Sequence, residues 1–160
     1  MALKRVLYVT RAKLSLRRAH ARNIVKTVDA LARVRGLGVR IVSSARESIT
    51  TDSIKEMHNL QSLREDSIVH VRSLAMYIIS ERRGFDILYF RDPKLAFIVL
   101  VGRLLLRKKV IFEIHGNREW RLLVPLWRLS FRITTGAVFI TKALEAWYGN
   151  PQKPSIVVHV

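Results

Sequence analysis

The chain has 160 residues and a mass of 18.5 kDa, a length that suits one globular domain. Its 49% hydrophobic residues, with only 7 Gly and 4 Pro, can bury a core, which excludes disordered, collagen-like and low-complexity proteins. The lack of Cys excludes disulfide scaffolds and thiolate zinc sites, and a net charge of +17 indicates an anionic partner such as nucleic acid, a lipid head-group surface or a phosphorylated substrate.

The first half of the chain alternates strand and helix patterns. Residues 4–10 form, after a charged start at Lys4 and Arg5, a continuous apolar, β-branched run, which is typical of a strand buried on both faces. A helical stripe follows over 19–34, and a second short strand is expected over 39–43. Residues 44–64 are polar and give no clear pattern. A dense apolar run then predicts a helix over 68–79.

The second half repeats the alternation more sharply. The helix expected over 92–106 has Pro93 in its first turn and is apolar nearly all round, so we expect it between two layers. The other predicted elements are a strand over 85–90, a strand over 110–114, a helix over 119–132, a strand over 136–140, a helix over 141–148 and a strand over 155–160. This order predicts one Rossmann-like α/β domain over residues 1–160, with a doubly wound parallel sheet.

No segment of the sequence has the pattern of a membrane span or a signal peptide. The longest apolar stretch, 95–106, is interrupted by Arg103 and is shorter than the ~20 residues that a membrane helix needs. The apolar run near Met1 is too short for a signal peptide. We therefore expect a cytoplasmic protein, either free or peripheral on a membrane surface.

Candidate ligand-binding residues follow the predicted strands, because open parallel sheets bind ligands beyond the carboxyl ends of their strands. These candidates are Thr10, Arg11, Lys13, Arg91, Asp92, Glu113, His115, Gly116, Thr141 and Lys142.

The loop after the first strand is strongly basic. Residues 1–46 hold 12 basic residues and one acidic residue. The cations of this loop and the following helix start are Arg11, Lys13, Arg17, Arg18 and Arg22. They indicate a cradle for a phosphate group, although a solvated basic loop is the alternative. His20 and Asn23, at the start of the predicted helix, fit either ligand binding or simple capping.

Several segments in order resemble a known enzyme family. They are residues 85–93 (FDILYFRDP), 109–116 (KVIFEIHG), 136–144 (GAVFITKAL), 155–160 (SIVVHV) and 20–23 (HARN). Together they resemble the amino-terminal half of GT-B glycosyltransferases of family four, which are retaining hexosyltransferases. The resemblance covers nearly the whole chain and is weakest over residues 44–64.

The resemblance implies an acceptor-binding half that works with a donor-binding domain or subunit. The donor substrate would be a nucleotide sugar, with no cofactor and no metal, and His115 would contact the transferred sugar. Glu113 would lie on the same side of its strand as His115. It would then orient the imidazole or bind the acceptor, although a satisfied core carboxylate is an equal alternative. A catalytic pair of Glu113 with Asp92 is the weaker interpretation.

The sequence also departs from the family pattern. No Glu is followed by a second Glu eight residues later, whereas the family holds its donor with such a pair. The usual Gly-rich loop after the first strand is replaced by residues 10–14 (TRAKL). We therefore expect a fragment, an engineered half or one subunit of a split enzyme, which would not transfer sugar alone.

The predicted helix over 119–132 combines aromatic and basic residues. Trp120, Trp127 and Phe131 share one stripe with Val124, and arginines occupy the neighbouring one. This pattern fits an interfacial helix on an anionic membrane with a phosphorylated or lipid-linked acceptor, or an ordinary core-packed Rossmann helix.

Two further interpretations of the whole chain remain open. A basic nucleic-acid-binding α/β domain would explain the charge, but residues 1–46 offer only Tyr8 as an aromatic partner for bases. A non-catalytic docking subunit would retain the fold without chemistry. The remaining histidines, His58, His70 and His159, have no ligand partners at a spacing that suits a metal.

Overall fold

A computed structural model describes residues 3–14, 19–44, 68–115, 124–148 and 154–157. The chain divides into two compact units, Met1–Asp86 and Ile87–Val160, and each is taken by itself. In both units every observed strand pairing is parallel and the strands alternate with helices. The predicted Rossmann-like α/β fold class is thereby confirmed.

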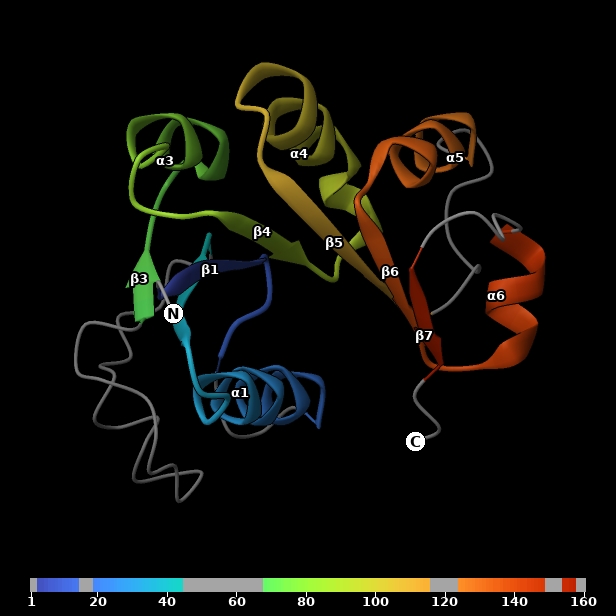
Figure 1. Cartoon of the computed structure of the whole chain (residues 1–160), viewed down its shortest axis with the longest axis horizontal. Coiled ribbons are helices and arrows are strands. Elements are labelled where there is room, and N and C mark those ends of the chain that lie inside the picture. Colours follow the sequence, from blue (N-terminus) through green and yellow to red (C-terminus); the bar gives the residue numbers. More distant parts are fainter. Residues whose placement is uncertain (1–2, 15–18, 45–67, 116–123, 149–153, 158–160) are drawn as a thin grey trace. The chain divides into compact units, whose positions relative to one another are not determined.

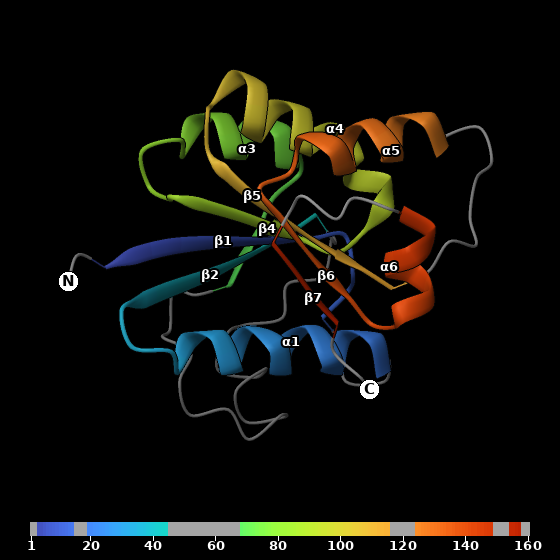
Figure 2. The same ribbon diagram turned by 45° about the vertical axis from the view of Figure 1, so that its right-hand side comes forward.

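The first unit contains three parallel strands in the order β3–β2–β1. Its elements are β1 (Lys4–Thr10), α1 (Ala19–Ala32), β2 (Leu37–Ser43), β3 (Ile68–His70) and α3 (Leu74–Ser80). Lys4 lies opposite Leu37 at one end of the β1–β2 pair, and Thr10 lies opposite Ser43 at the other. Helices α1 and α3 lie on opposite faces of these strands (Figure 1, Figure 2).

The second unit contains four parallel strands in the order β4–β5–β6–β7. Its elements are β4 (Ile87–Phe90), a 3-10 turn (Pro93–Leu95), α4 (Ala96–Leu100), a π-helical turn (Val101–Leu105), β5 (Lys109–Ile114), α5 (Val124–Ile133), β6 (Gly136–Phe139), α6 (Lys142–Tyr148) and β7 (Ser155–Val157). Helices α4 and α5 lie side by side, joined where Ser130 Oγ donates to Ala96 O at 3.0 Å.

The predicted helix over 68–79 is wrong at its start. Ile68 and Val69 belong to β3 and lie opposite Ile41 and Val42 of β2, because a short β-branched pair suits a strand at the edge of the sheet. The helix begins only after Ser73, whose hydroxyl accepts the Met76 N–H at 3.4 Å. The other predicted elements are confirmed where the structure describes them, with ends that differ by a few residues.

The adjacent strands β4 and β5 have one apolar face and one polar face. Leu88 and Phe90 of β4, and Val110 and Phe112 of β5, are all fully buried. The Phe90 and Phe112 rings stack with centroids 4.4 Å apart. Since successive side chains of a strand point to opposite faces, Tyr89 and Glu113 lie on the other face. Polar chemistry at this end of β4 and β5 is therefore confined to one face.

The predicted helix over 92–106 is divided into a 3-10 turn, α4 and the π turn, and it is not enclosed by two layers. The π turn is closed by the Leu106 N–H, which donates to Val101 O at 3.0 Å. Gly102 packs against Leu88 and Val110 on the apolar face of the strands. On the outer side, however, Leu104 and Leu105 are 64% and 65% exposed. The expectation that this helix is buried all round is wrong.

Phe131 of helix α5 packs in the core. Phe131 is buried, and its ring lies 5.8 Å from that of Phe139 and 5.5 Å from that of Tyr148. Phe131 therefore does not belong to a membrane-facing stripe. Trp120 and the side chains of Val124 and Trp127 lie outside the described residues. None of the described helices is long and apolar enough to cross a membrane.

Replacing Gly102 by Ala is expected to destabilise the fold by about 1 kcal/mol or more, measured by urea unfolding. A Cβ at this position would lie 2.6 Å from Leu88 Cδ2 and 3.2 Å from Val110 Cγ2. Both neighbours are fully buried, so overpacking outweighs the gain of about 1 kcal/mol in helix propensity. The matched control is Gly38→Ala, whose Cβ would meet only the exposed side chain of Leu3. An equal loss in both variants would contradict this account.

Candidate functional site

A buried carboxylate stands at the carboxyl end of β5. Glu113 is 6% exposed, and the Tyr89 hydroxyl donates to its Oε2 at 2.9 Å. Its other oxygen, Oε1, forms a hydrogen bond with His115 Nε2 and lies 3.9 Å from Arg91 Nε. We call Tyr89, Arg91, Glu113 and His115 the strand-end cluster. Every member comes from β4, β5 or the residue directly after one of these strands.

The strand register brings the cluster together. Tyr89 lies opposite Ile111 and Phe90 lies opposite Phe112, so Arg91 comes level with Glu113. Tyr89 and Arg91 are two residues apart, as are Glu113 and His115, and residues so spaced share one face of a strand. The structure thus brings together three sequence-predicted candidates: Arg91, Glu113 and His115.

The hydrogen bonds assign the tautomer of His115. Arg91 Nη2 lies 3.1 Å from His115 Nδ1, and a guanidinium can only donate, so Nδ1 is the acceptor. The ring proton is then on Nε2, which donates to the carboxylate of Glu113. The side chain of His115 is 29% exposed, whereas those of Arg91 and Glu113 are each 7% exposed. His115 is therefore the member of the cluster that a ligand can reach most readily.

The environment of Glu113 favours its ionised form. Burial alone would raise the pKa of its carboxyl group, but the hydrogen bonds from His115 and Tyr89 and the charge of Arg91 together lower the pKa below its usual value. Among the described residues, Arg91 Nε has no hydrogen-bond partner. The charge of Arg91 is thus paired with Glu113, while one of its donors is left unused.

The loop after β1 is held by side chains of the first unit. Thr10 Oγ1 accepts the Ala12 N–H at 3.0 Å, and the buried Ser43 hydroxyl donates to Ala12 O at 2.9 Å. Thr10 therefore fixes its own loop, which leaves Arg11 and Lys13 as the exposed cations on it. These two are the described residues of this loop that can meet a phosphate.

The remaining candidates are dispersed. Asp92 accepts the Lys94 N–H at 2.9 Å and Thr141 accepts the Leu144 N–H at 3.2 Å, so both act as caps at the start of helical segments. Three further candidates are exposed and outside the cluster, namely Arg22, Asn23 and Lys142. The candidates on which the structure gives no description are Arg17, Arg18, Gly116 and the side chain of His20.

Sequence reasoning missed Tyr89 and Ser43. The spacing of Tyr89 and Arg91 on one strand matches that of Glu113 and His115 on the next, and this matched spacing could have indicated Tyr89. Nothing in the sequence distinguishes Ser43 from an ordinary strand end. Within the part of the chain that the structure describes, no three His, Asp or Glu side chains gather as a metal ion would require.

Comparison with known proteins supports the fold. A solved structure from Listeria monocytogenes, assigned as a UDP-N-acetylglucosamine 2-epimerase, matches with a TM-score of 0.63 and 17% sequence identity. The match covers 99% of this chain and 45% of that one, so this chain spans less than half the length of its structural neighbour. At this identity the likeness shows the α/β fold alone. No family model and no curated protein matches the sequence.

The strand-end cluster predicts how stability depends on pH. The pKa of Glu113 is lower in the folded chain than its usual value of 4.5, so the ionised carboxylate stabilises the fold above about pH 4.5. That stabilisation is lost as the pH falls through the lower, folded value. Tyr89→Phe removes a hydrogen bond that lowers the pKa of Glu113, so the acid loss of stability should be smaller and should be complete at a higher pH. Glu113→Gln removes the titrating group, so the acid loss of stability should become weaker.

Urea unfolding at stepped pH measures these profiles. The matched control is Tyr77→Phe, because the Tyr77 hydroxyl accepts from Arg40 at 3.4 Å, whereas the Tyr89 hydroxyl donates to Glu113. Identical acid profiles for the Tyr89 and Tyr77 variants would show that the phenol does not tune the carboxyl group.

Proposed function

We propose that this chain is the acceptor-side half of a retaining GT-B glycosyltransferase similar to family four. It would move a hexose from a nucleotide sugar to the hydroxyl of a phosphorylated or lipid-linked acceptor. The shared fold with a protein assigned as a nucleotide-sugar epimerase supports a nucleotide-sugar enzyme in general. The motifs at residues 85–93 and 109–116 favour a transferase. A donor-binding half, in the same or a separate polypeptide, completes the proposed enzyme.

The observation that carries the proposal is the strand-end cluster. It lies at the carboxyl ends of β4 and β5, where open α/β sheets bind their ligands. The side chain of His115 is 29% exposed, and that of its partner Glu113 is 7% exposed. The carboxylate holds the imidazole in one orientation. Such a fixed imidazole suits hydrogen bonding to a hydroxyl of the transferred sugar. Glu113 serves here as a positioning residue rather than as an acid or base.

The geometry restricts how a sugar could bind His115. Nε2 donates to Glu113 and Nδ1 accepts from Arg91, so both ring nitrogens are occupied. A sugar hydroxyl that donates to Nδ1 would therefore take the place of Arg91 Nη2. Arg91 would keep its charge pairing with Glu113, since Nε lies 3.9 Å from Oε1. The exchange replaces one hydrogen bond by another and leaves no buried charge without a counter-charge.

The basic loop of the first unit is proposed to bind phosphate. Arg11 and Lys13 are exposed, and no acidic residue occurs among residues 1–28. Exposed arginine and lysine side chains are suited to the diphosphate of a nucleotide sugar or the phosphate of an acceptor.

Nucleic-acid binding is the second candidate, and the net charge of +17 favours it. Binding to single strands usually adds aromatic side chains on which bases stack. Within residues 3–14 and 19–44, however, the one aromatic residue is Tyr8, which is fully buried. These two described segments thus offer charge without an exposed aromatic side chain, and the sugar-transfer proposal explains the strand-end cluster better.

The first test measures sugar transfer directly. The purified 160-residue chain is expected to transfer no sugar from a panel of labelled nucleotide sugars, because the proposed donor-binding half is not part of it. Addition of a donor-binding half from a GT-B enzyme of family four is expected to give transfer. Turnover by the chain alone would contradict the proposed division of roles. Duplex DNA binding without any transfer in the combined system would favour the second candidate.

The second test concerns His115 in the combined enzyme. His115→Ala should lower kcat by roughly 10²-fold, since a hydrogen bond that strengthens on the reacting sugar is lost. The free energy of unfolding should change far less than this loss would require. Gly38→Ala, at a site far along the chain from the cluster, is the control for handling and folding. Unchanged kcat in His115→Ala would remove His115 from the proposed site.

A further inference from the structure

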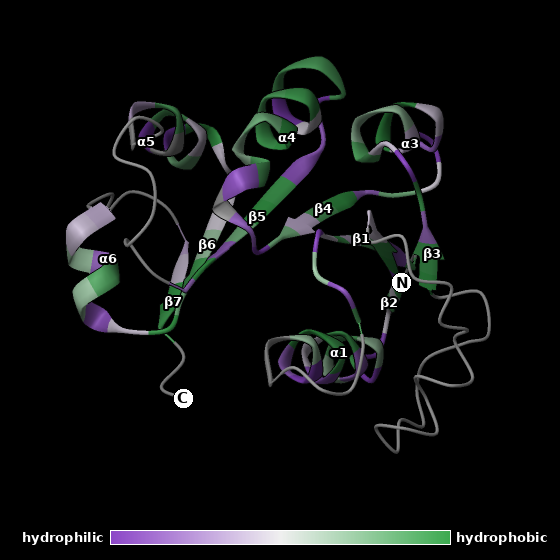
Figure 3. Ribbon diagram, turned by 180° about the vertical axis from the view of Figure 1, so that it is seen from behind, coloured by the Kyte–Doolittle hydropathy of each residue, from purple (hydrophilic) through white to green (hydrophobic). Residues whose placement is uncertain are grey.

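The outer side of α4, the π turn and α5 carries large apolar side chains that are 43–65% exposed: Phe97, Leu104, Leu105 and Leu129. We call these four residues the apolar strip. Ser130 and Ala96 are hydrogen-bonded at 3.0 Å, so their neighbours Leu129 and Phe97 lie where α4 meets α5. Figure 3 shows that hydrophobic residues make up much of α4. The strip continues from this junction along the helix into the π turn.

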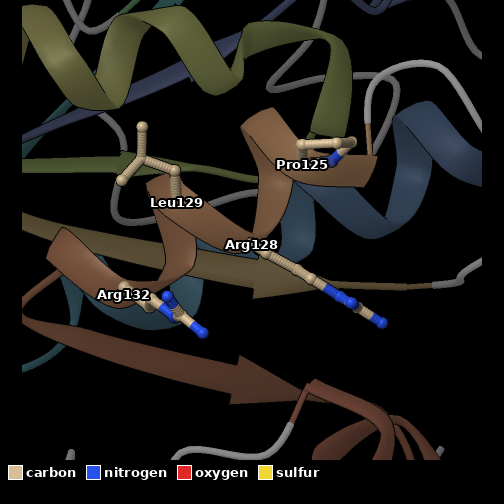
Figure 4. Close-up of a pocket in the computed structure, with 4 residues that line it drawn as sticks. All are labelled: Pro125, Arg128, Leu129 and Arg132. Carbon is tan, nitrogen blue, oxygen red and sulfur yellow. The ribbon is translucent and has the colours of Figure 1, made fainter.

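The charged residues within the two segments that carry the apolar strip are all basic. Residues 93–107 and 124–133 contain no Asp or Glu, and their exposed basic residues are Lys94, Arg103, Arg107, Arg128 and Arg132. Arg128 and Arg132 project from the same side of α5, beside a shallow hollow of about 270 Å³ that Leu129 and Pro125 also line (Figure 4). Apolar and cationic side chains therefore alternate over one helical surface of the second unit.

The positive charge of this surface favours one kind of binding partner over others. A second copy of the chain would bring five cations against five cations, which is repulsive. A nucleic acid would pair with the cations but would leave the exposed leucines in contact with water. An anionic bilayer satisfies both groups, because its head groups pair with arginines while its acyl boundary accepts leucine and phenylalanine.

We propose that the apolar strip and its five surrounding cations form a docking surface for an anionic membrane. The strip enters the boundary between head groups and acyl chains, and the cations lie at the level of the lipid phosphates. Burial of four apolar side chains adds a contribution that salt does not screen, whereas the arginines add one that salt weakens. The proposal rests on the second unit alone and does not require the proposed sugar transfer.

The test is co-sedimentation of the full chain with vesicles. Binding is expected to phosphatidylcholine vesicles that contain phosphatidylglycerol, and not to phosphatidylcholine alone. Leu104→Ser with Leu105→Ser should weaken binding at least about tenfold and remove the binding that persists at high salt. Arg103→Gln with Arg128→Gln should weaken binding at low salt by roughly thirtyfold, since each cation near an anionic surface adds about 1 kcal/mol.

Matched control variants replace exposed apolar and basic residues of the first unit by the same residue types, Ser and Gln. Val34→Ser with Met76→Ser removes two apolar side chains that are 50% and 68% exposed, and Arg82→Gln with Arg83→Gln removes two exposed cations. Both pairs lie in the first unit, so the proposal expects nearly unchanged vesicle binding for the apolar pair and a smaller loss for the arginine pair. Circular dichroism verifies folding, and Leu129→Ser replaces the leucine pair if that variant unfolds.

Several results would overturn the proposal. They are absence of binding to the anionic vesicles, leucine variants that bind like the parent chain, and equal losses in the apolar control pair. Duplex DNA binding that responds to the arginines, together with vesicle binding that ignores the leucines, would assign the surface to nonspecific charge. A leucine variant that changes the mass in sedimentation velocity but not vesicle binding would assign it to self-association.

Discussion

The buried negative charge of Glu113 constrains the carboxyl end of the sheet in the second unit. A carboxylate with 6% exposure is unstable unless charges and hydrogen-bond donors replace the water that it has lost. Tyr89 and Arg91 on the neighbouring strand, and His115 beyond its own strand, supply these groups. Since each partner also depends on the carboxylate, the four side chains form one interdependent network. The exposed edge of His115 acquires its orientation from residues that a ligand does not reach.

The opposite face of the same strands follows a different constraint. Leu88, Phe90, Val110 and Phe112 exclude water completely, and Gly102 lets the helical segment approach them closely. Because successive side chains point to opposite faces, these two strands keep the polar cluster on one face and the packed apolar side chains on the other. The helical segment that covers the apolar face carries a second set of apolar side chains, Phe97, Leu104 and Leu105, which are exposed on its outer side. That outer side becomes available for contacts with other molecules.

Local pattern predicted most of the fold. After its charged start, β1 is a continuous apolar run, and such a run marks a strand buried on both faces. Ile68–His70 was misassigned because a three-residue strand is too short to show a period, and its pairing with β2 is a tertiary effect. Glu113, His115 and Arg91 were found from strand ends and spacing. The capping by Asp92 and Thr141, and the loop fixed by Thr10, depend on backbone geometry that residue types alone do not reveal.

The π turn at Val101–Leu105 changes the directions in which side chains project around the axis of the helix that contains it. In an α-helix each residue rotates by about 100° around the axis, so the direction of Gly102 toward the strands would fix the directions of the two leucines that follow. The wider turn closed by Leu106 and Val101 reduces the rotation per residue. Leu104 and Leu105 can therefore both project outward as adjacent residues while Gly102 stays inward. The direction of Gly102 therefore does not fix the directions of Leu104 and Leu105. As a result, the two surfaces of this segment can diverge in sequence independently.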